Sequence, residues 1–335
     1  MDQRLGISLA HATMQQRIPL AERADRAGFE SIWVEDGDAF VAIASMAHAV
    51  KRARLGTGIA RAFTRSALVT ATASANLQEL TEGRFILGLG TGTKRQNLFQ
   101  IGQEFDHPAT RVAELAELLR GAWAHDPESA YHYEGKFNDV TWDGPNVHRA
   151  HAGRPIPVYL AAVNDYMLQT AGRVFDGLAG HPCFTPPYLE QVVSARIGDG
   201  LAKAGRTRDS FTLTSWVITS IDEDRGLARK RAAYQIGYYL STKSYQHLLD
   251  WHGWEAQKDP IRNAFFAGDW EGLAAAVTDD MIDTMAVAGT PNDAIDKIGR
   301  FQQALDVPIL YSHAAGPARA DAGANLDRIL KTFGA

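Results

Sequence analysis

Short apolar runs alternate with segments of helical spacing along most of the 335-residue chain, and this rhythm limits the possible folds more than any other feature. The runs at residues 5–9, 31–34, 54–59 and 85–89 are apolar throughout and do not alternate with polar positions. Such runs are typical of strands in a parallel sheet whose faces are covered by helices. The first third of the chain therefore predicts four consecutive strand–helix units.

The same rhythm continues to the end of the chain with two interruptions. The remaining strands are predicted at residues 156–160, 177–179, 211–218 and 308–311. Helices are predicted at residues 19–28, 40–50, 66–80, 109–123, 291–304 and 323–333. Residues 124–150 and 237–285 interrupt the pattern as insertions after strands four and seven. Eight units predict an α/β fold, a (β/α)8 TIM barrel in a single domain over residues 1–335, with an open doubly wound sheet as the alternative.

Charge and composition limit the partners. The formal net charge is -5 and no Lys/Arg-rich block is present, so we expect neither a nucleic-acid partner nor a membrane surface. We expect no secretory signal, because the first residues show no basic region followed by an apolar run, and no apolar run reaches the ~18 residues that a membrane-spanning helix needs. The single cysteine, Cys183, excludes an intramolecular disulfide and fits a reducing cytoplasm, the predicted location.

Polar residues follow the predicted strands, where barrel enzymes carry their chemistry. They are His11 after strand one, Glu35 and Asp36 after strand two, Arg61 and Arg65 after strand three, His181 after strand six and His313 after strand eight. Any one of them alone is expected to cap a helix or face solvent. Because strand ends of one barrel face converge, their number favours a functional site there.

Two strand-end segments are candidates for close contact with a ligand. Gly90-Thr91-Gly92-Thr93 offers backbone N–H groups without an obstructing side chain, but it lacks the third glycine and the later acidic residue of a dinucleotide-binding fingerprint. Ala161-Ala162-Val163-Asn164 precedes a helix whose amino terminus is a potential anion site. Asn164 is equally well explained as a plain helix cap, and both roles can hold together.

Several stretches resemble the luciferase-like flavin and deazaflavin oxidoreductase superfamily. They are residues 24–35, 55–59, 77–92 and 157–162, together with Arg65, Ala171-Gly172-Arg173 and Asp176-Gly177. The chain is most similar to an actinobacterial branch assigned to the deazaflavin coenzyme F420, through His181-Pro182, Thr185-Pro186, Tyr188-Leu189 and residues 248–254. The resemblance extends over nearly the whole chain.

The resemblance implies a barrel with an insertion after strand seven and a flavin or deazaflavin ring at the strand ends. It also implies a non-proline cis peptide at Gly58-Ile59 behind the ring and the cofactor phosphate at residues 161–164. F420 is the expected cofactor and FMN the alternative. The cofactor-binding residues implied are Asp36, Gly58, Ile59, Ala60, Gly90, Thr91, Gly92, Thr93, Ala161, Ala162, Val163, Asn164 and His181.

Two positions depart from the F420-dependent sugar-phosphate and alcohol dehydrogenases of that superfamily. Gly37 stands where those enzymes carry a histidine, and Thr93 where they carry a glutamate. The usual acid and base are therefore missing. His181, His11 and Asp36 are the catalytic candidates in their place, with Glu35 as a further one.

We expect an oxidoreductase that transfers a hydride between F420 and a small organic substrate, with the aromatic insertion at residues 238–254 as a substrate lid. We also expect a homo-oligomer, a dimer. Three alternatives stay open: an FMN-dependent monooxygenase, a non-catalytic flavin-binding protein and a metal-dependent barrel hydrolase. The last would use His11, His181, His313 and Asp36 as ligands, although strand one lacks the His-x-His pair usual in such barrels.

Overall fold

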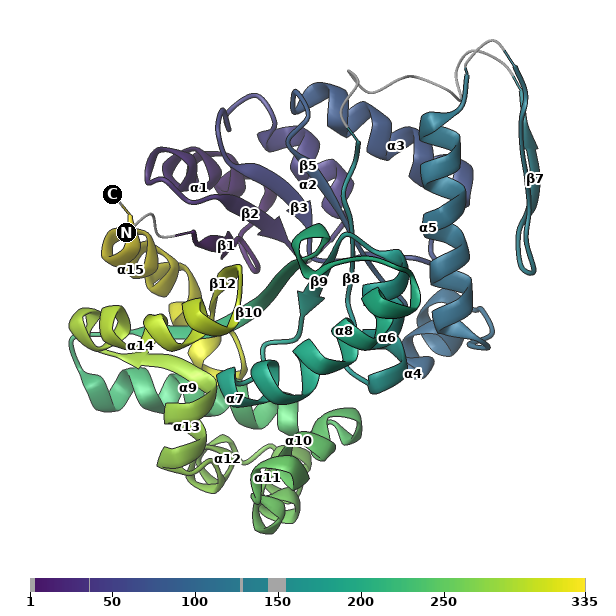
Figure 1. The fold of residues 1–335 in the computed structure, drawn as a ribbon. Coiled ribbons are helices and arrows are strands. Elements are labelled where there is room, and N and C mark those ends of the chain that lie inside the picture. Colours follow the sequence, from purple (N-terminus) through teal and green to yellow (C-terminus); the bar gives the residue numbers. More distant parts are fainter. Residues whose placement is uncertain (1–3, 36, 127–128, 144–154, 335) are drawn as a thin grey trace.

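The computed structural model of the chain describes residues 4–35, 37–126, 129–143 and 155–334 (Figure 1). Within them, eight parallel strands form a closed barrel, because the seventh, β10, pairs with both β9 and β12. In barrel order the strands are β1 (Gly6–Ser8), β2 (Ser31–Val34), β3 (Arg54–Thr57), β5 (Phe85–Gly90), β8 (Val158–Leu160), β9 (Gly177–Gly180), β10 (Thr212–Ile221) and β12 (Val307–Ser312). The predicted barrel is thereby confirmed, and the open sheet is excluded.

Helices surround the barrel (Figure 1). Those that follow the strands are α1 (Met14–Arg26), α2 (Ala39–Met46), α3 (Ala67–Leu80), α5 (Pro108–Ala124), α6 (Asp165–Val174), α8 (Ser194–Lys203), α14 (Pro291–Ala304) and α15 (Ala322–Phe333). Polar caps set several of their starts: Thr13, Asp38, Ser66 and Asn164 each accept a backbone N–H of the first turn. Among the helices of the described residues, none is both long and apolar enough to cross a membrane.

The first helix begins earlier than predicted. Its apolar spacing pointed to residues 19–28, but α1 starts at Met14 and contains Pro19. The reason is a capping box, in which the Thr13 side chain accepts from Gln16 N–H and the Gln16 side chain accepts from Thr13 N–H. Pro19 is the sixth residue of α1, so it removes one backbone hydrogen bond, and the helix continues through it.

The insertion after strand four contains structure that the sequence pattern did not predict. Within residues 124–150, β6 (Tyr131–Glu134) and β7 (Asp139–Trp142) form an antiparallel hairpin beside α5 (Figure 1). The Glu114 carboxylate of α5 holds its turn by accepting the backbone N–H groups of Lys136, Phe137 and Asn138 at 2.6–3.1 Å. Residues 144–150 of this insertion lie outside the described residues.

The insertion after strand seven is helical, as predicted. After α9 (Arg225–Leu240) come α10 (Gln246–His252), α11 (Lys258–Ala267), α12 (Trp270–Ala276) and α13 (Asp279–Met285), grouped at one side of the barrel (Figure 1). The strand β11 (Ala286–Gly289), which was not predicted, follows and pairs with the end of β10. A further short strand, β4 (Ala60–Arg61), pairs with β5 where β3 has ended.

Large aromatic side chains fill the upper barrel interior and support the carboxyl ends of the strands. The Trp33 ring of β2 contacts the Trp216 ring of β10 edge to face, with centroids 5.3 Å apart. Gly56 leaves the space that Trp33 occupies, since a Cβ there would lie 2.6 Å from its Cζ3 atom. Trp33 is 1% exposed and Trp216 is 5% exposed, so this pair closes the barrel below its carboxyl ends.

Candidate functional site at the carboxyl ends of the strands

A cavity of about 260 Å³ opens where the carboxyl ends of the barrel strands meet. Six of the eight barrel strands or the loops after them contribute to its wall, together with α9. The lining residues are Glu35, Gly58, Ile59, Ala161, Ala162, Val163, Ala179, Gly180, His181, Pro182, Trp216, Tyr239 and Tyr311. Its wall combines small residues with aromatic ones, a lining suited to a flat organic ring.

The backbone after β3 bends sharply behind this cavity. The peptide bond between Gly58 and Ile59 is cis, as the resemblance implied. The bend leaves no room for a side chain at Gly58, because a Cβ there would overlap the Trp216 ring. It also packs closely on β5, since a Cβ at Gly90 would lie 2.6 Å from Cδ1 of Ile59.

Glu35 is the one carboxylate among the residues that line the cavity within the described chain. One of its oxygens accepts from the Ser8 hydroxyl at 2.7 Å, and the other accepts from the Trp216 indole N–H. Glu35 thus joins β1, β2 and β10 at their carboxyl ends. The hydrogen bonds fix the carboxylate and orient the indole that packs on Gly58.

A second cavity, of about 540 Å³, shares Glu35 and Ile59 with the first. Its other lining residues are Gly37, Asp38, Ala39, Phe40, Ala60, Arg61, Thr64, Arg65, Thr70 and Leu89. Arg65 pairs with Asp38 and lies over the Phe40 ring, whereas Arg61 donates to the amide oxygen of Gln100 at 3.1 Å. Ligand pockets in proteins measure roughly 300–1,000 Å³, so the two cavities together match a ligand with a ring and a polar tail.

The segment Ala161–Asn164 was predicted to hold the cofactor phosphate and to start a helix; the structure confirms the helix start, and contact with a cofactor stays a prediction. Ala161, Ala162 and Val163 line the smaller cavity. Asn164 caps α6 by accepting the N–H of Met167 at 3.0 Å. The first turn of α6 therefore lies next to the cavity wall.

The glycine-rich segment after β5 does not line either cavity. Thr93 caps the short helix α4 (Lys94–Gln96), and its hydroxyl accepts the Gln96 N–H at 3.2 Å. The buried Asn97 amide donates to the carbonyl oxygens of Thr91 and Thr93 at 2.8 and 2.9 Å, and Gly92 has a left-handed φ of 67°. Cofactor contact by Gly90, Thr91, Gly92 and Thr93 stays a prediction.

His181 lies in the cavity wall after β9. Its ring lies over that of Tyr245 with centroids 4.0 Å apart, and its Nδ1 accepts the Cys183 N–H at 3.2 Å. Burial lowers the pKa of His181 to about 3, with a smaller contribution from His247. The imidazole is neutral at physiological pH, which does not favour the acid role predicted for it.

The remaining histidine candidates lie apart from the cavity wall. His11 is exposed after β1, with a φ of 66°, and its Nε2 lies 3.4 Å from the Tyr311 hydroxyl. His313 is fully buried behind β12, 3.4 Å from an Asp321 oxygen. Asp36 lies outside the described residues. In the described part of the chain no group of three or more His, Cys, Asp or Glu is placed to hold a metal ion, so nothing there supports the hydrolase alternative.

Six residues of the cavity wall were not among the predicted site residues: Ala179, Gly180, Pro182, Trp216, Tyr239 and Tyr311. Trp216 and Tyr311 belong to apolar strands, where an aromatic side chain is usually core packing. Tyr239 is the partial exception, because the aromatic insertion that begins at residue 238 was predicted to reach the substrate. No local signal distinguishes it from Tyr238, which is 44% exposed.

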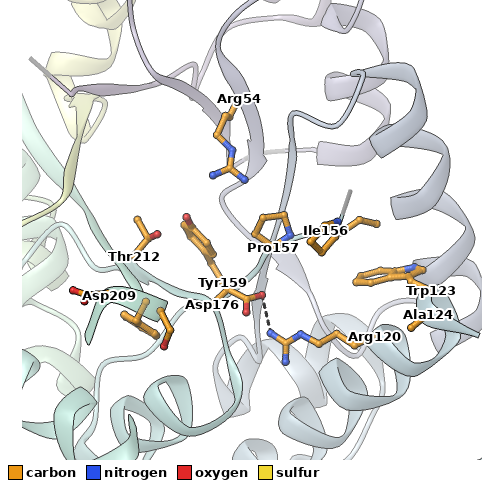
Figure 2. Close-up of a pocket in the computed structure, with 13 residues that line it drawn as sticks. Arg54, Arg120, Trp123, Ala124, Ile156, Pro157, Tyr159, Asp176, Asp209 and Thr212 are labelled. Atoms are coloured by element: carbon orange, nitrogen blue, oxygen red, sulfur yellow. Dashed lines mark hydrogen bonds and ion pairs between the residues drawn. The ribbon is translucent and has the colours of Figure 1, made fainter. Parts of the chain in front are cut away.

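A larger cavity, of about 660 Å³, lies at the opposite, amino-terminal ends of the strands (Figure 2). Figure 2 shows Tyr159, Arg54 and Thr212 around it, with an ion pair of 2.8 Å between Arg120 and Asp176. One of its lining residues is Pro155, which directly follows residues 144–154, outside the described part of the chain. In (β/α)8 barrels this face serves stability and the opposite face carries the chemistry, so we place the functional site at the carboxyl ends.

A closed parallel barrel with a ligand-sized cavity at the carboxyl ends of its strands is the architecture of a (β/α)8-barrel enzyme. Residues 3–306 match the sequence profile of the family described as luciferase-like monooxygenase. The chain belongs to this family, as the resemblance had predicted.

Relatives from archaea and bacteria are similar to the chain over most of their length. The chain is 30% identical to a 5,10-methylenetetrahydromethanopterin reductase of Archaeoglobus fulgidus over 305 residues, 88% of each chain. It is 32% identical to an uncharacterized protein of Mycobacterium tuberculosis H37Rv over 278 residues, 81% of this chain and 82% of the relative. Among solved structures, the coenzyme F420-dependent tetrahydromethanopterin reductase of Methanopyrus kandleri superposes with a TM-score of 0.83 at 25% identity, covering 99% of this chain and 98% of the reductase.

Proposed function

We propose that the protein is an oxidoreductase that transfers a hydride between the deazaflavin coenzyme F420 and a small organic substrate. The observation that carries the proposal is the cavity at the strand ends, whose wall includes Gly58, small residues of the segment 161–162 and Gly180. The two similar reductases support a deazaflavin as the occupant, since the one with a solved structure is described as F420-dependent and superposes over almost the whole chain.

The residues present fit such a cofactor. Gly58, Ala161, Ala162 and Gly180 give the smaller cavity walls that a planar ring can approach closely. The amino terminus of α6, next to Ala162 and Val163, offers unpaired backbone N–H groups to a phosphate. Arg61, in the wall of the cavity of about 540 Å³, adds positive charge for an anionic tail.

The chemistry of the bound cofactor would be hydride donation or acceptance, and the protein would provide position and shelter. The Gly58-Ile59 bend and Trp216 would back the ring on one side. His181, neutral and packed on Tyr245, would close the end of the cavity and keep water from it. Glu35 would hold Trp216 in place across the barrel mouth.

Cofactor choice is tested by tryptophan fluorescence, since Trp216 lines the cavity. We expect F420 to quench the emission with a micromolar Kd and FMN to bind at least ~10-fold more weakly, a difference of about 1.4 kcal/mol. The variant Trp216→Phe identifies the reporter, because it should lose most of the quenching. Tighter binding of FMN would favour the monooxygenase alternative and reject F420.

A further inference from the structure

Reduction of a polarised double bond by hydride leaves an electron pair on the atom next to the one that is attacked, and that atom must take a proton. Gly37 and Thr93 stand at the two positions that the resemblance marks for an acid and a base. Gly37 has no side chain to donate, and the Thr93 hydroxyl is engaged as the cap of α4. The proton must therefore come from another group at the cavity.

Two tyrosines of the cavity wall are joined by a hydrogen bond. The Tyr239 hydroxyl of α9 donates to the Tyr311 hydroxyl of β12 at 3.1 Å. The Tyr311 hydroxyl in turn lies 3.4 Å from Nε2 of His11, which is exposed at the surface. Three side chains from separate parts of the chain thus form a series of neighbouring hydrogen-bonding groups between solvent and the cavity.

Among the described residues, the other groups at the cavity that could supply a proton are less suited to the task. Both oxygens of Glu35 are engaged, with Ser8 and with Trp216. His181 is neutral, because burial lowers its pKa to about 3. Cys183 is fully buried behind the wall, and burial raises the pKa of its thiol far above the usual range.

We propose that Tyr239 is the proton donor to the substrate and that Tyr311 and His11 resupply it from solvent. This inference rests on the proposed hydride transfer from reduced F420. The hydride brings two electrons to the attacked atom, and the π pair of the double bond moves to its neighbour. The Tyr239 O–H bond breaks as that neighbour takes the proton, and the oxygen of Tyr239 takes the proton of Tyr311. Tyr311 takes a proton from Nε2 of His11, and His11 recovers one proton from bulk solvent, so each turnover removes one proton from solvent.

The properties of the three groups suit this order. Burial and the neighbouring Tyr311 hold the pKa of Tyr239 well above its usual range, so the phenol keeps its proton until the substrate demands it. A phenolate left alone there would be costly, which makes a relay behind Tyr239 necessary. Each hydroxyl can both donate and accept a hydrogen bond. Rotation of the two O–H bonds therefore reverses the direction in which the Tyr239–Tyr311 pair passes a proton. His11 is exposed, so its imidazole is in contact with solvent.

The first test needs neither cofactor nor substrate. In ligand-free protein, the imidazole ¹⁵N resonances of His11 report the hydrogen bond at Nε2. Tyr311→Phe should shift the Nε2 resonance, Tyr239→Phe should shift it less, and the matched control Tyr238→Phe should leave it unchanged. Tyr238 is the adjacent residue of α9 and does not line the cavity. If the chemical shift of Nε2 is the same in Tyr311→Phe and in the wild-type protein, the proposed relay is wrong.

The second test follows oxidation of reduced F420 by its absorbance, with 2-cyclohexen-1-one as the hydride acceptor. We expect Tyr239→Phe to lower kcat by on the order of 10²-fold, with the Kd of F420 unchanged. His11→Ala should also lower kcat, and added imidazole should restore part of it. The solvent isotope effect on kcat should differ from the wild-type value in Tyr239→Phe and equal the wild-type value in Tyr238→Phe.

The outcomes separate the two proposals. Failure of the wild-type protein to bind F420 rejects the proposed function, whatever the His11 resonances show. Binding and turnover that persist at the wild-type rate in Tyr239→Phe reject the relay and leave the proposed function intact. Circular dichroism of each Phe variant shows whether the fold is retained, which a substitution that removes only a hydroxyl should allow.

Discussion

At the scale of single residues, the shape of the site depends on two glycines, which leave room because they have no side chain. Gly58 and Gly90 allow the bend after β3 to lie between Trp216 and β5. At Gly58 the obstruction is a rigid indole, fixed by its hydrogen bond to Glu35. A side chain at this position must therefore displace Trp216 or open the bend.

We predict that Gly58→Val reduces cofactor binding more than it reduces stability. The added side chain would push the Trp216 ring out of the cavity wall, and such overpacking costs about 1–3 kcal/mol. The Kd of F420 should rise at least ~10-fold, measured by fluorescence, while a cooperative thermal transition remains. Gly198→Ala is the control, because nothing lies within 4 Å of a Cβ at that helical position. Equal affinity in Gly58→Val and the wild-type protein would show that the bend does not shape the site.

The sequence predicted the backbone part of this site better than its side chains. The bend at Gly58-Ile59 and the wall at residues 161–163 belong to contiguous motifs, so a resemblance could place them. Tyr239 and Tyr311 are 72 residues apart along the chain, and only barrel closure brings their hydroxyls together. The spacing of residues along the chain cannot predict such a contact, because the contact depends on where α9 packs over the strand ends.

At the scale of elements, strands and helices with their own caps were predictable, and elements held by distant groups were not. Ser66 and Asn164 cap α3 and α6 as local sequence rules require. The hairpin β6–β7 lacks a long apolar period, and its turn is held by Glu114, a residue of α5 more than 20 positions earlier. Its stability is a tertiary property.

We predict that Glu114→Ala frees this hairpin from α5. Glu114 is 7% exposed, and its loss leaves the N–H groups of residues 136–138 and the Asn138 amide without their acceptor. A hydrogen bond to a charged group contributes about 1.5–3 kcal/mol, but the turn is partly exposed and water can replace most of the lost bonds. The free energy of unfolding should therefore fall by about the value of one such bond, roughly 2–3 kcal/mol. Hydrogen exchange at residues 131–142 should become faster, and Glu114→Gln, which keeps one acceptor oxygen, should lie between the two. Unchanged exchange in Glu114→Ala would mean that the hairpin is held by its own contacts.

At the scale of the whole molecule, a charged network closes the barrel beside β12. Arg231 pairs with Asp222 at 2.7 Å and with Asp321 at 2.9 Å, and Arg328 also pairs with Asp321. These four side chains join α9, β10 and α15 around the buried His313. Burial, and then the charges of Arg231 and Arg328, lower the pKa of His313 to about 3. The expected dimer is a second property at this scale and stays a prediction, open to sedimentation analysis.

We predict that buried His313 makes the protein less stable as the pH falls below neutrality. An unfolded histidine titrates near ~6.5, so between that pH and about 3 the unfolded chain binds a proton at His313 that the folded chain does not. The free energy of unfolding therefore falls with decreasing pH by up to ~1.4 kcal/mol per pH unit for this residue. Denaturant unfolding at pH 7.5, 6.5 and 5.5 measures the slope. In His313→Gln the protein is expected to be less stable at pH 7.5, because the buried site is repacked, yet its slope should be shallower than that of the wild-type protein. His48→Gln, at an exposed position, should keep the wild-type slope. Parallel slopes for His313→Gln and the wild-type protein would show that the acid sensitivity arises elsewhere, with His181, whose pKa burial also lowers to about 3, as the next residue to replace.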